Sequence, residues 1–146
     1  MQTQTRASSQ ESPAPTAAQE SSGRRVDVPL ILLVDDEEPI LETLVMIVED
    51  MGYETAQAAN GEEALRSAQT HWPSLIITDM MMPRLDGAQF IAALRQGAQA
   101  NGKPLPPIIL LTAGMSPRVD QVGASTILTK PFLIEDLEAI IRQYLP

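Results

Sequence analysis

From residue 29 onward, short apolar runs alternate with longer segments whose apolar residues recur at helical spacing. The runs predict strands at residues 30–34, 54–59, 75–78, 107–112 and 125–129, and the longer segments predict helices at 39–51, 62–71, 87–99 and 134–145. Strands that alternate with helices in this way form a parallel sheet covered on both faces, and right-handed crossovers leave few topologies. The pattern therefore predicts an α/β fold around a five-stranded parallel sheet.

The first 28 residues differ in composition from the rest of the chain. They are rich in Gln, Ser, Thr, Ala and Pro and lack apolar periodicity. Such a segment buries too little apolar surface to offset the entropy lost on ordering, so we expect a disordered tail over 1–28 and one folded domain over 29–146. The tail is either a passive extension or a docking arm, and its composition leaves both open.

The net charge and the absence of cysteine exclude several classes of function. Ten basic and nineteen acidic side chains give a formal charge of −9, which argues against binding to nucleic acid or to an anionic membrane. No apolar run reaches the roughly 18 residues of a membrane span, and the N-terminus lacks the apolar stretch of a secretory signal. Without cysteine there are no disulfides, thiol nucleophiles or Cys-ligated metals. We therefore expect a cytoplasmic protein with no nucleic-acid or membrane partner.

Polar residues stand at the ends of four of the five predicted strands. Asp35 and Asp36 follow the first strand, and Asp79 follows the third. Thr112 ends the fourth strand, and Lys130 follows the fifth. Ligand sites of open parallel sheets lie beyond the carboxyl ends of the strands. One such acid alone would usually be a turn former or a helix cap, but together these residues predict a site at one sheet edge.

The charges of this cluster indicate what it binds. Two carboxylates about 4 Å apart repel each other by roughly 4 kcal/mol at an effective dielectric constant of 20. Three carboxylates and Lys130 leave an excess of two negative charges, which a divalent cation would cancel. Oxygen ligands without His or Cys suit a hard ion, so we expect Mg²⁺.

Four strings in the chain resemble a response regulator receiver domain of bacterial two-component signalling. They are LLVDDEEPI from residue 32, LIITDMMMPRLDG from residue 75, LLTAG from residue 110 and LTKPF from residue 128. The resemblance covers about residues 30–145. It implies a flavodoxin-like (βα)5 sandwich of the CheY type with strand order 2-1-3-4-5. The stretch between Thr112 and Lys130 is several residues shorter than is usual in the family, so we expect a shortened fourth helix.

The resemblance also implies a role for each residue of the cluster. Asp79 would accept a phosphoryl group from a sensor histidine kinase or a phosphotransfer protein and form an acyl phosphate. Asp35, Asp36, Asp79 and the backbone carbonyl of Met81 would hold Mg²⁺. Thr112 would donate a hydrogen bond to a phosphoryl oxygen.

Lys130 would pair with the phosphoryl group, and by resemblance the Lys130–Pro131 bond would be cis. The expected function is that of a stand-alone response regulator in which phosphorylation switches binding to an unknown downstream protein or relays phosphate onward. It would not be an enzyme on other substrates, and would catalyse only its own phosphorylation and slow dephosphorylation.

Two positions depart from the family pattern. Many receivers carry an aromatic residue three positions before the lysine, where this chain has Ile127, so we expect the signal to be read without an aromatic switch. Met81 and Gly114 occupy positions that influence hydrolysis of the acyl phosphate in receivers. Because methionine cannot orient an attacking water, we expect slow self-dephosphorylation.

Three other functions share parts of this pattern. A haloacid-dehalogenase-type phosphatase would need a second aspartate where Met81 stands, and a flavin-binding module would need a phosphate-binding loop where the chain has DDEEP. A receiver-like interaction module that works without phosphorylation is the main alternative. His71 and Trp72 fall in the loop before the third strand, at the opposite sheet edge. We therefore expect the fluorescence of Trp72 to change very little when Mg²⁺ binds.

Overall fold

The computed structural model describes residues 28–114 and 122–146, and contains one parallel sheet. The strands are β1 (Leu30–Val34), β2 (Glu54–Ala58), β3 (Leu75–Asp79), β4 (Ile108–Ala113) and β5 (Thr126–Lys130), in the order β2-β1-β3-β4-β5. The helices are α1 (Glu38–Asp50), α2 (Gly61–Thr70), α3 (Gly87–Ala100) and α5 (Ile134–Tyr144). This confirms the predicted fold class and strand order. The predicted fourth helix and all but the last residue of the predicted tail lie outside the described residues.

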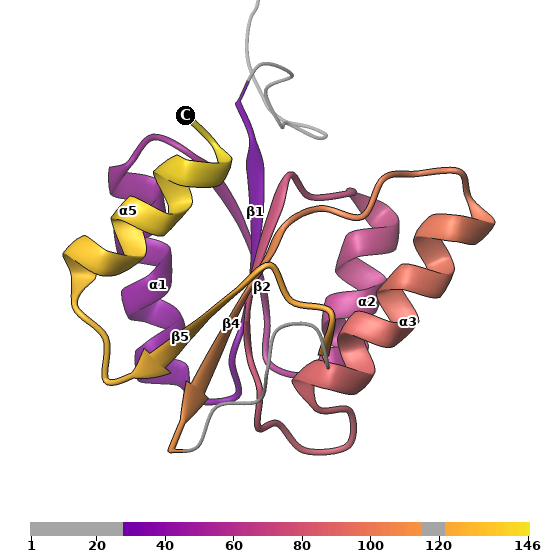
Figure 1. Cartoon of the computed structure of the whole chain (residues 1–146), viewed down its shortest axis with the longest axis horizontal. Coiled ribbons are helices and arrows are strands. Elements are labelled where there is room, and N and C mark those ends of the chain that lie inside the picture. The colour runs from indigo at the N-terminus through magenta and orange to yellow at the C-terminus, as the bar shows by residue number, and fades with distance from the viewer. Residues whose placement is uncertain (1–27, 115–121) are drawn as a thin grey trace, which may run out of the picture.

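The described helices cover both faces of the sheet (Figure 1). Helices α1 and α5 pack on one face and α2 and α3 on the other, and each face has its own cluster of buried apolar side chains. All five residues of β1 and of β3 are buried, as expected for central strands of a parallel sheet. Among the described helices, none is both long and apolar enough to cross a membrane.

The strand register aligns the ends from which the cluster residues project. Val34 lies opposite Thr78, so Asp35 and Asp79 follow at the same level. Leu111 lies opposite Asp79, and Thr112 comes one residue later. Ala113 pairs with the last residue of β5, Lys130. The polar residues at the ends of four strands therefore lie at one edge of the sheet.

The start of α3 is built against the end of β3. Asp86 and Gln89 form a capping box, in which each side chain accepts a hydrogen bond from the backbone N–H of the other residue. A Cβ on Gly87 would lie 2.8 Å from the carbonyl oxygen of Asp79 and 2.9 Å from the Cα of Met80. Only glycine therefore lets the helix start this close to the strand that carries Asp79.

Candidate functional site

The structure brings the three aspartates of the sheet edge into one cluster. Asp35, Asp36 and Asp79 each offer a carboxylate oxygen, and these oxygens lie within 4.8 Å of one another. The residues Asp35 and Asp79 are only 1% and 6% exposed, whereas Asp36 is exposed. Among the described residues, this is the only group of three potential metal-ligating acidic, histidine or cysteine side chains at such short range.

Lys130 bridges the two buried carboxylates. Its Nζ lies 3.1 Å from Oδ2 of Asp35 and 3.2 Å from Oδ1 of Asp79. The second oxygen of Asp35 accepts a hydrogen bond of 2.9 Å from the backbone N–H of Glu37. The resemblance suggested Lys130 as a partner for a phosphoryl group, and the ion pair with Asp35 is an additional contact. The bond between Lys130 and Pro131 is cis, as expected.

Thr112 lies at the same edge, and its hydroxyl is only weakly hydrogen-bonded within the described part of the chain. The residue is 3% exposed, and among the described residues its hydroxyl donates one long hydrogen bond of 3.5 Å, to the carbonyl of Ala113. A hydroxyl held so weakly can turn toward an oxygen that enters beside Asp79. Ile127 also lies on β5 but packs against the apolar cluster beneath α2 and α3, so it belongs to the core.

The loop after β3 contains three consecutive methionines that differ in exposure. The backbone N–H of Met80 donates to Leu111, and its carbonyl accepts from Gly87. Met82 is buried and Met80 half-buried, and both contact the apolar core. Met81 has a side chain that is 69% exposed. Its carbonyl accepts no hydrogen bond within the described part of the chain, so this oxygen remains able to bind a cation.

The protonation of the cluster follows from burial and from its charges. Burial, and then the negative charge of Asp35, raise the pKa of Asp79 above its usual value, although Lys130 opposes the shift. For Lys130, burial alone would lower the pKa. The hydrogen bonds and ion pairs with Asp35 and Asp79 outweigh burial, so the pKa of Lys130 is raised and its ammonium stays charged.

The donor set of the cluster fits a hard divalent cation. It consists of three carboxylates and one available carbonyl, with a single ammonium that leaves the negative charge in excess. Oxygen donors in this number suit Mg²⁺. The structure therefore places the predicted residues Asp35, Asp36, Asp79, Thr112 and Lys130 at one edge. His71 and Trp72 lie at the start of β3, at the opposite edge, as expected.

Two features of the site were not visible in the sequence. One is the backbone N–H of Glu37, which holds Asp35 in place. The other is the close approach at Gly87, which positions α3 against the end of β3. The Asp-Gly pair predicted a turn at this point, but the need for glycine depends on the distance between two backbones, which no local pattern encodes.

Comparisons with known proteins agree with this geometry. The sequence model of the response regulator receiver domain matches residues 31–142. The chain is 41% identical over 119 residues to "Response regulator Rre1" of Synechocystis sp., covering 79% of this chain and 51% of that protein. It is 40% identical over 120 residues to the "Alkaline phosphatase synthesis transcriptional regulatory protein PhoP" of Bacillus subtilis, covering 79% of this chain and 48% of that protein. It thus spans about half the length of these curated relatives.

Solved structures give the same result for the fold. The chemotaxis protein CheY4 of Vibrio cholerae superposes with a TM-score of 0.72 at 35% identity, covering 80% of this chain and 98% of that one. A response regulator from Chloroflexus aurantiacus, described as putative, superposes with a TM-score of 0.72 at 31% identity, covering 82% and 98%.

Proposed function

The chain belongs to the response regulator receiver domain family, whose members are signalling modules phosphorylated by kinases, and we propose that Asp79 is its phosphoacceptor. The observation that carries this assignment is the pairing of Asp79 with Lys130 in a cluster of three carboxylates. Asp79 ends a fully buried strand, so the backbone holds the nucleophile in a fixed place. Such positioning is most of what a protein contributes to phosphoryl transfer.

The reaction is an exchange of bonds at phosphorus. An oxygen of Asp79 forms a new P–O bond while the P–N bond to the donor's phosphohistidine breaks, and the electron pair of that bond stays on the imidazole, which is then protonated. The ammonium of Lys130, already 3.2 Å from Asp79, neutralises charge on the phosphoryl oxygens. The Thr112 hydroxyl donates a hydrogen bond to one of these oxygens.

We assign the cation site to Asp35, Asp36, Asp79 and the carbonyl of Met81. Receiver domains of this family bind Mg²⁺ in an acidic pocket, and the oxygen donors of this chain suit that ion. When bound, Mg²⁺ supplies a positive charge that screens the phosphoryl oxygens from the carboxylates. The raised pKa of Asp79 supports this assignment, because burial and the charge of Asp35 disfavour its ionised form.

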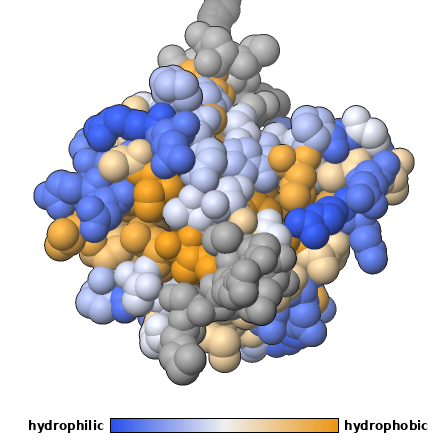
Figure 2. All heavy atoms as spheres, in the orientation of Figure 1, coloured by the Kyte–Doolittle hydropathy of each residue, from blue (hydrophilic) through white to orange (hydrophobic). Residues whose placement is uncertain are grey.

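The phosphodonor docks, in our proposal, on the apolar surface beside the cluster. A hollow there is lined mainly by apolar side chains, and its members include Ile40 of α1, Phe132 and Ile134, together with Lys130 from the cluster itself. Leu133 is 65% exposed and Ile134 48% exposed. Figure 2 shows hydrophobic side chains at the surface near the start of α5. A sensor histidine kinase or a phosphotransfer protein that covers this surface would bring its histidine to Asp79.

Intact-mass measurement tests the phosphoacceptor directly. Wild-type protein and Asp79→Asn are each incubated with acetyl phosphate and Mg²⁺. We expect a phosphate-sized gain in the wild type only, and none when EDTA replaces Mg²⁺. An equal gain in Asp79→Asn would assign the phosphoryl group to another residue. No gain in either protein would favour a receiver-like module that binds its partner without phosphorylation.

The wider role is also a proposal. Phosphorylation of Asp79 would switch binding to a downstream protein or pass the phosphoryl group onward, without action on other substrates. A receiver that works alone in the cytoplasm stays a prediction. The mass and the fractionation of the native protein in its source cell test it, because an attached output domain would increase the mass of the chain.

A further inference from the structure

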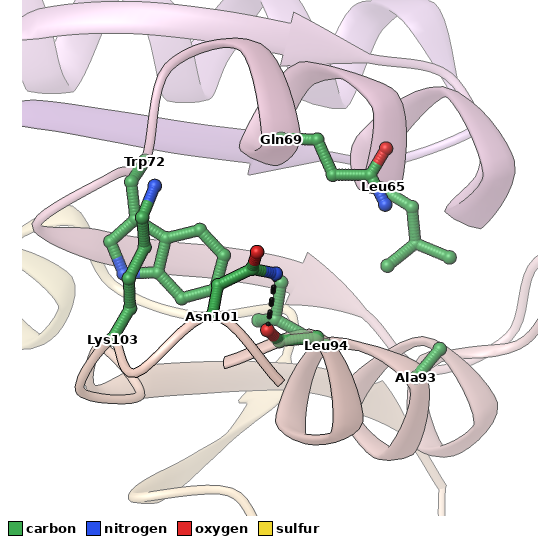
Figure 3. Close-up of a pocket in the computed structure, with 8 residues that line it drawn as sticks. Leu65, Gln69, Trp72, Ala93, Leu94, Asn101 and Lys103 are labelled. Carbon is green, nitrogen blue, oxygen red and sulfur yellow. Dashed lines mark hydrogen bonds between the residues drawn. The ribbon is translucent and has the colours of Figure 1, made fainter. Parts of the chain in front are cut away.

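A hollow of about 280 Å³ lies between α2 and α3, away from the acidic cluster. Figure 3 shows Leu65 of α2 across from Ala93 and Leu94 of α3, with Trp72 and Lys103 at one end. Trp72 precedes β3 and Lys103 precedes β4, so this end of the hollow lies at the sheet edge opposite Asp79. The proposed phosphoryl chemistry does not use this surface.

Gly97 lines the hollow, and the packing of the described residues gives no reason for a glycine there. Within this part of the chain, a Cβ at Gly97 would meet no heavy atom within 4 Å, and its backbone is not in the left-handed region. Glycine inside a helix is less stable than alanine. Gly87 in the same helix differs, because a Cβ there would lie 2.8 Å from backbone. Gly97 therefore keeps one wall of the hollow open, which favours close approach by another segment.

Lys103 and Trp72 set the chemistry of the open end. The Lys103 ammonium lies 5.3 Å from the centroid of the Trp72 ring, and the indole N–H donates to the carbonyl of Pro104, which fixes the ring. Lys103 is exposed and has no ion pair with any described carboxylate. A cation beside an aromatic ring and an apolar floor suits an extended ligand that has prolines and a carboxylate.

The N-terminal tail of the chain joins the domain next to this hollow. The backbone N–H of Ser74, two residues after Trp72, donates to the carbonyl of Leu30 at 2.8 Å. Within the tail, residues 11–20 read ESPAPTAAQE, which has two prolines and three alanines between two glutamates. The chain from Pro15 to Val28 spans up to about 45 Å when extended. This length is enough for residues 11–20 to reach the hollow from the start of β1. The connection also gives the segment an effective concentration in the millimolar range.

We propose that residues 11–20 occupy the hollow between α2 and α3 of their own chain. Pro13 and Pro15 pack against Trp72, the alanines lie along the open wall at Gly97, and a flanking glutamate pairs with Lys103. The tail is then a docking arm held at the edge opposite Asp79. This docking is independent of phosphorylation and stands whether or not Asp79 accepts a phosphoryl group.

Paramagnetic relaxation tests the docking in the full chain. Because the protein has no cysteine, Ala17→Cys carries a nitroxide at a single place. We expect the amide signals of Gly97 and Asn101 and the indole N–H signal of Trp72 to lose most of their intensity, while those of α1 and α5 keep theirs. Adding Gly97→Gln, which places a longer side chain at the wall of the hollow, should restore the signals of Asn101 and Trp72.

Trp72 is the only tryptophan, so its fluorescence gives an independent readout. Pro13→Ser combined with Pro15→Ser leaves the domain unaltered, and should increase quenching of Trp72 by acrylamide. Lys103→Gln should weaken the relaxation effect, and so should added salt.

Three results would overturn the proposal. One is an unchanged spectrum near the hollow, and another is broadening that persists in Gly97→Gln. The third comes from a mixture of spin-labelled protein with unlabelled ¹⁵N protein. In this mixture, the ¹⁵N signals can be broadened only by the nitroxide of another molecule. Broadening as strong as that seen when the nitroxide and ¹⁵N are on the same chain would mean that the tail of a second copy occupies the hollow.

Discussion

Burial and the neighbouring carboxylate of Asp35 both disfavour the ionised form of Asp79. Its pKa in the folded protein is above the ordinary value of 3.8, with burial as the largest cause. When the pKa of a carboxyl group is higher in the folded protein than in the unfolded chain, the group favours the folded state at low pH. This contribution to the free energy of unfolding is fully present below the pKa of the unfolded chain, and it is lost as the pH rises through the pKa of the folded protein. Above the folded pKa of Asp79, and without Mg²⁺, the ionised carboxylate therefore destabilises the domain.

Asp79→Asn should consequently stabilise the Mg²⁺-free protein. We expect about 1 kcal/mol at pH 7, or a rise of about 4 °C in the midpoint of thermal unfolding. The gain should shrink as the pH falls through the folded pKa of Asp79. Asp50→Asn, an exposed acid on α1, is the matched control and should change stability by less than about 0.5 kcal/mol. A loss of stability in Asp79→Asn would contradict a raised pKa of Asp79 in the folded protein.

Met81 is expected to slow loss of the phosphoryl group from Asp79. Its exposed side chain has no hydrogen-bond donor and only a weak acceptor sulfur, so it cannot orient a water for attack on phosphorus. Met81→Asn should shorten the half-life of the phosphorylated protein, measured by intact mass after the phosphodonor is removed. Met46→Asn, equally exposed on α1, is the control and should leave the half-life unchanged. A wild-type half-life of seconds or less would show that the prediction is wrong.

At the scale of elements, the contact between α3 and β3 depends on Gly87. Its place beside the backbone of Asp79 and Met80 leaves no room for a methyl group, so the helix would have to shift. Gly87→Ala should destabilise the domain by about 2 kcal/mol in urea unfolding. Ala92→Ser, on the exposed side of the same helix, should cost less than about 0.5 kcal/mol. Equal stability of Gly87→Ala and wild type would mean that the helix starts further from the strand.

For the whole molecule, Mg²⁺ should stabilise the fold without disturbing its far end. A ligand that binds only the native state raises the free energy of unfolding by about 1.4 kcal/mol for each tenfold excess over its dissociation constant. We expect the unfolding midpoint to rise with Mg²⁺ in the wild type and to rise much less in Asp36→Asn. Trp72 fluorescence should remain nearly constant during the titration, because the indole lies at the opposite edge. Strong quenching would place the cation near Trp72 instead.

The sequence alone determined the order and type of the elements and the residues at the strand ends. Buried runs such as 75–79 and helical periods such as 134–144 follow from local apolar spacing, which depends on the near neighbours of each residue. The topology rule then placed Asp35, Asp79, Thr112 and Lys130 at one edge before any distance was known.

Only the tertiary structure decided how these residues meet. That Lys130 bridges Asp35 and Asp79, that Gly87 permits the approach of α3 and that Gly97 leaves a hollow beside Trp72 all depend on distances between segments far apart in the chain. Such distances arise from the packing of helices on a twisted sheet, and no local pattern of residues contains them.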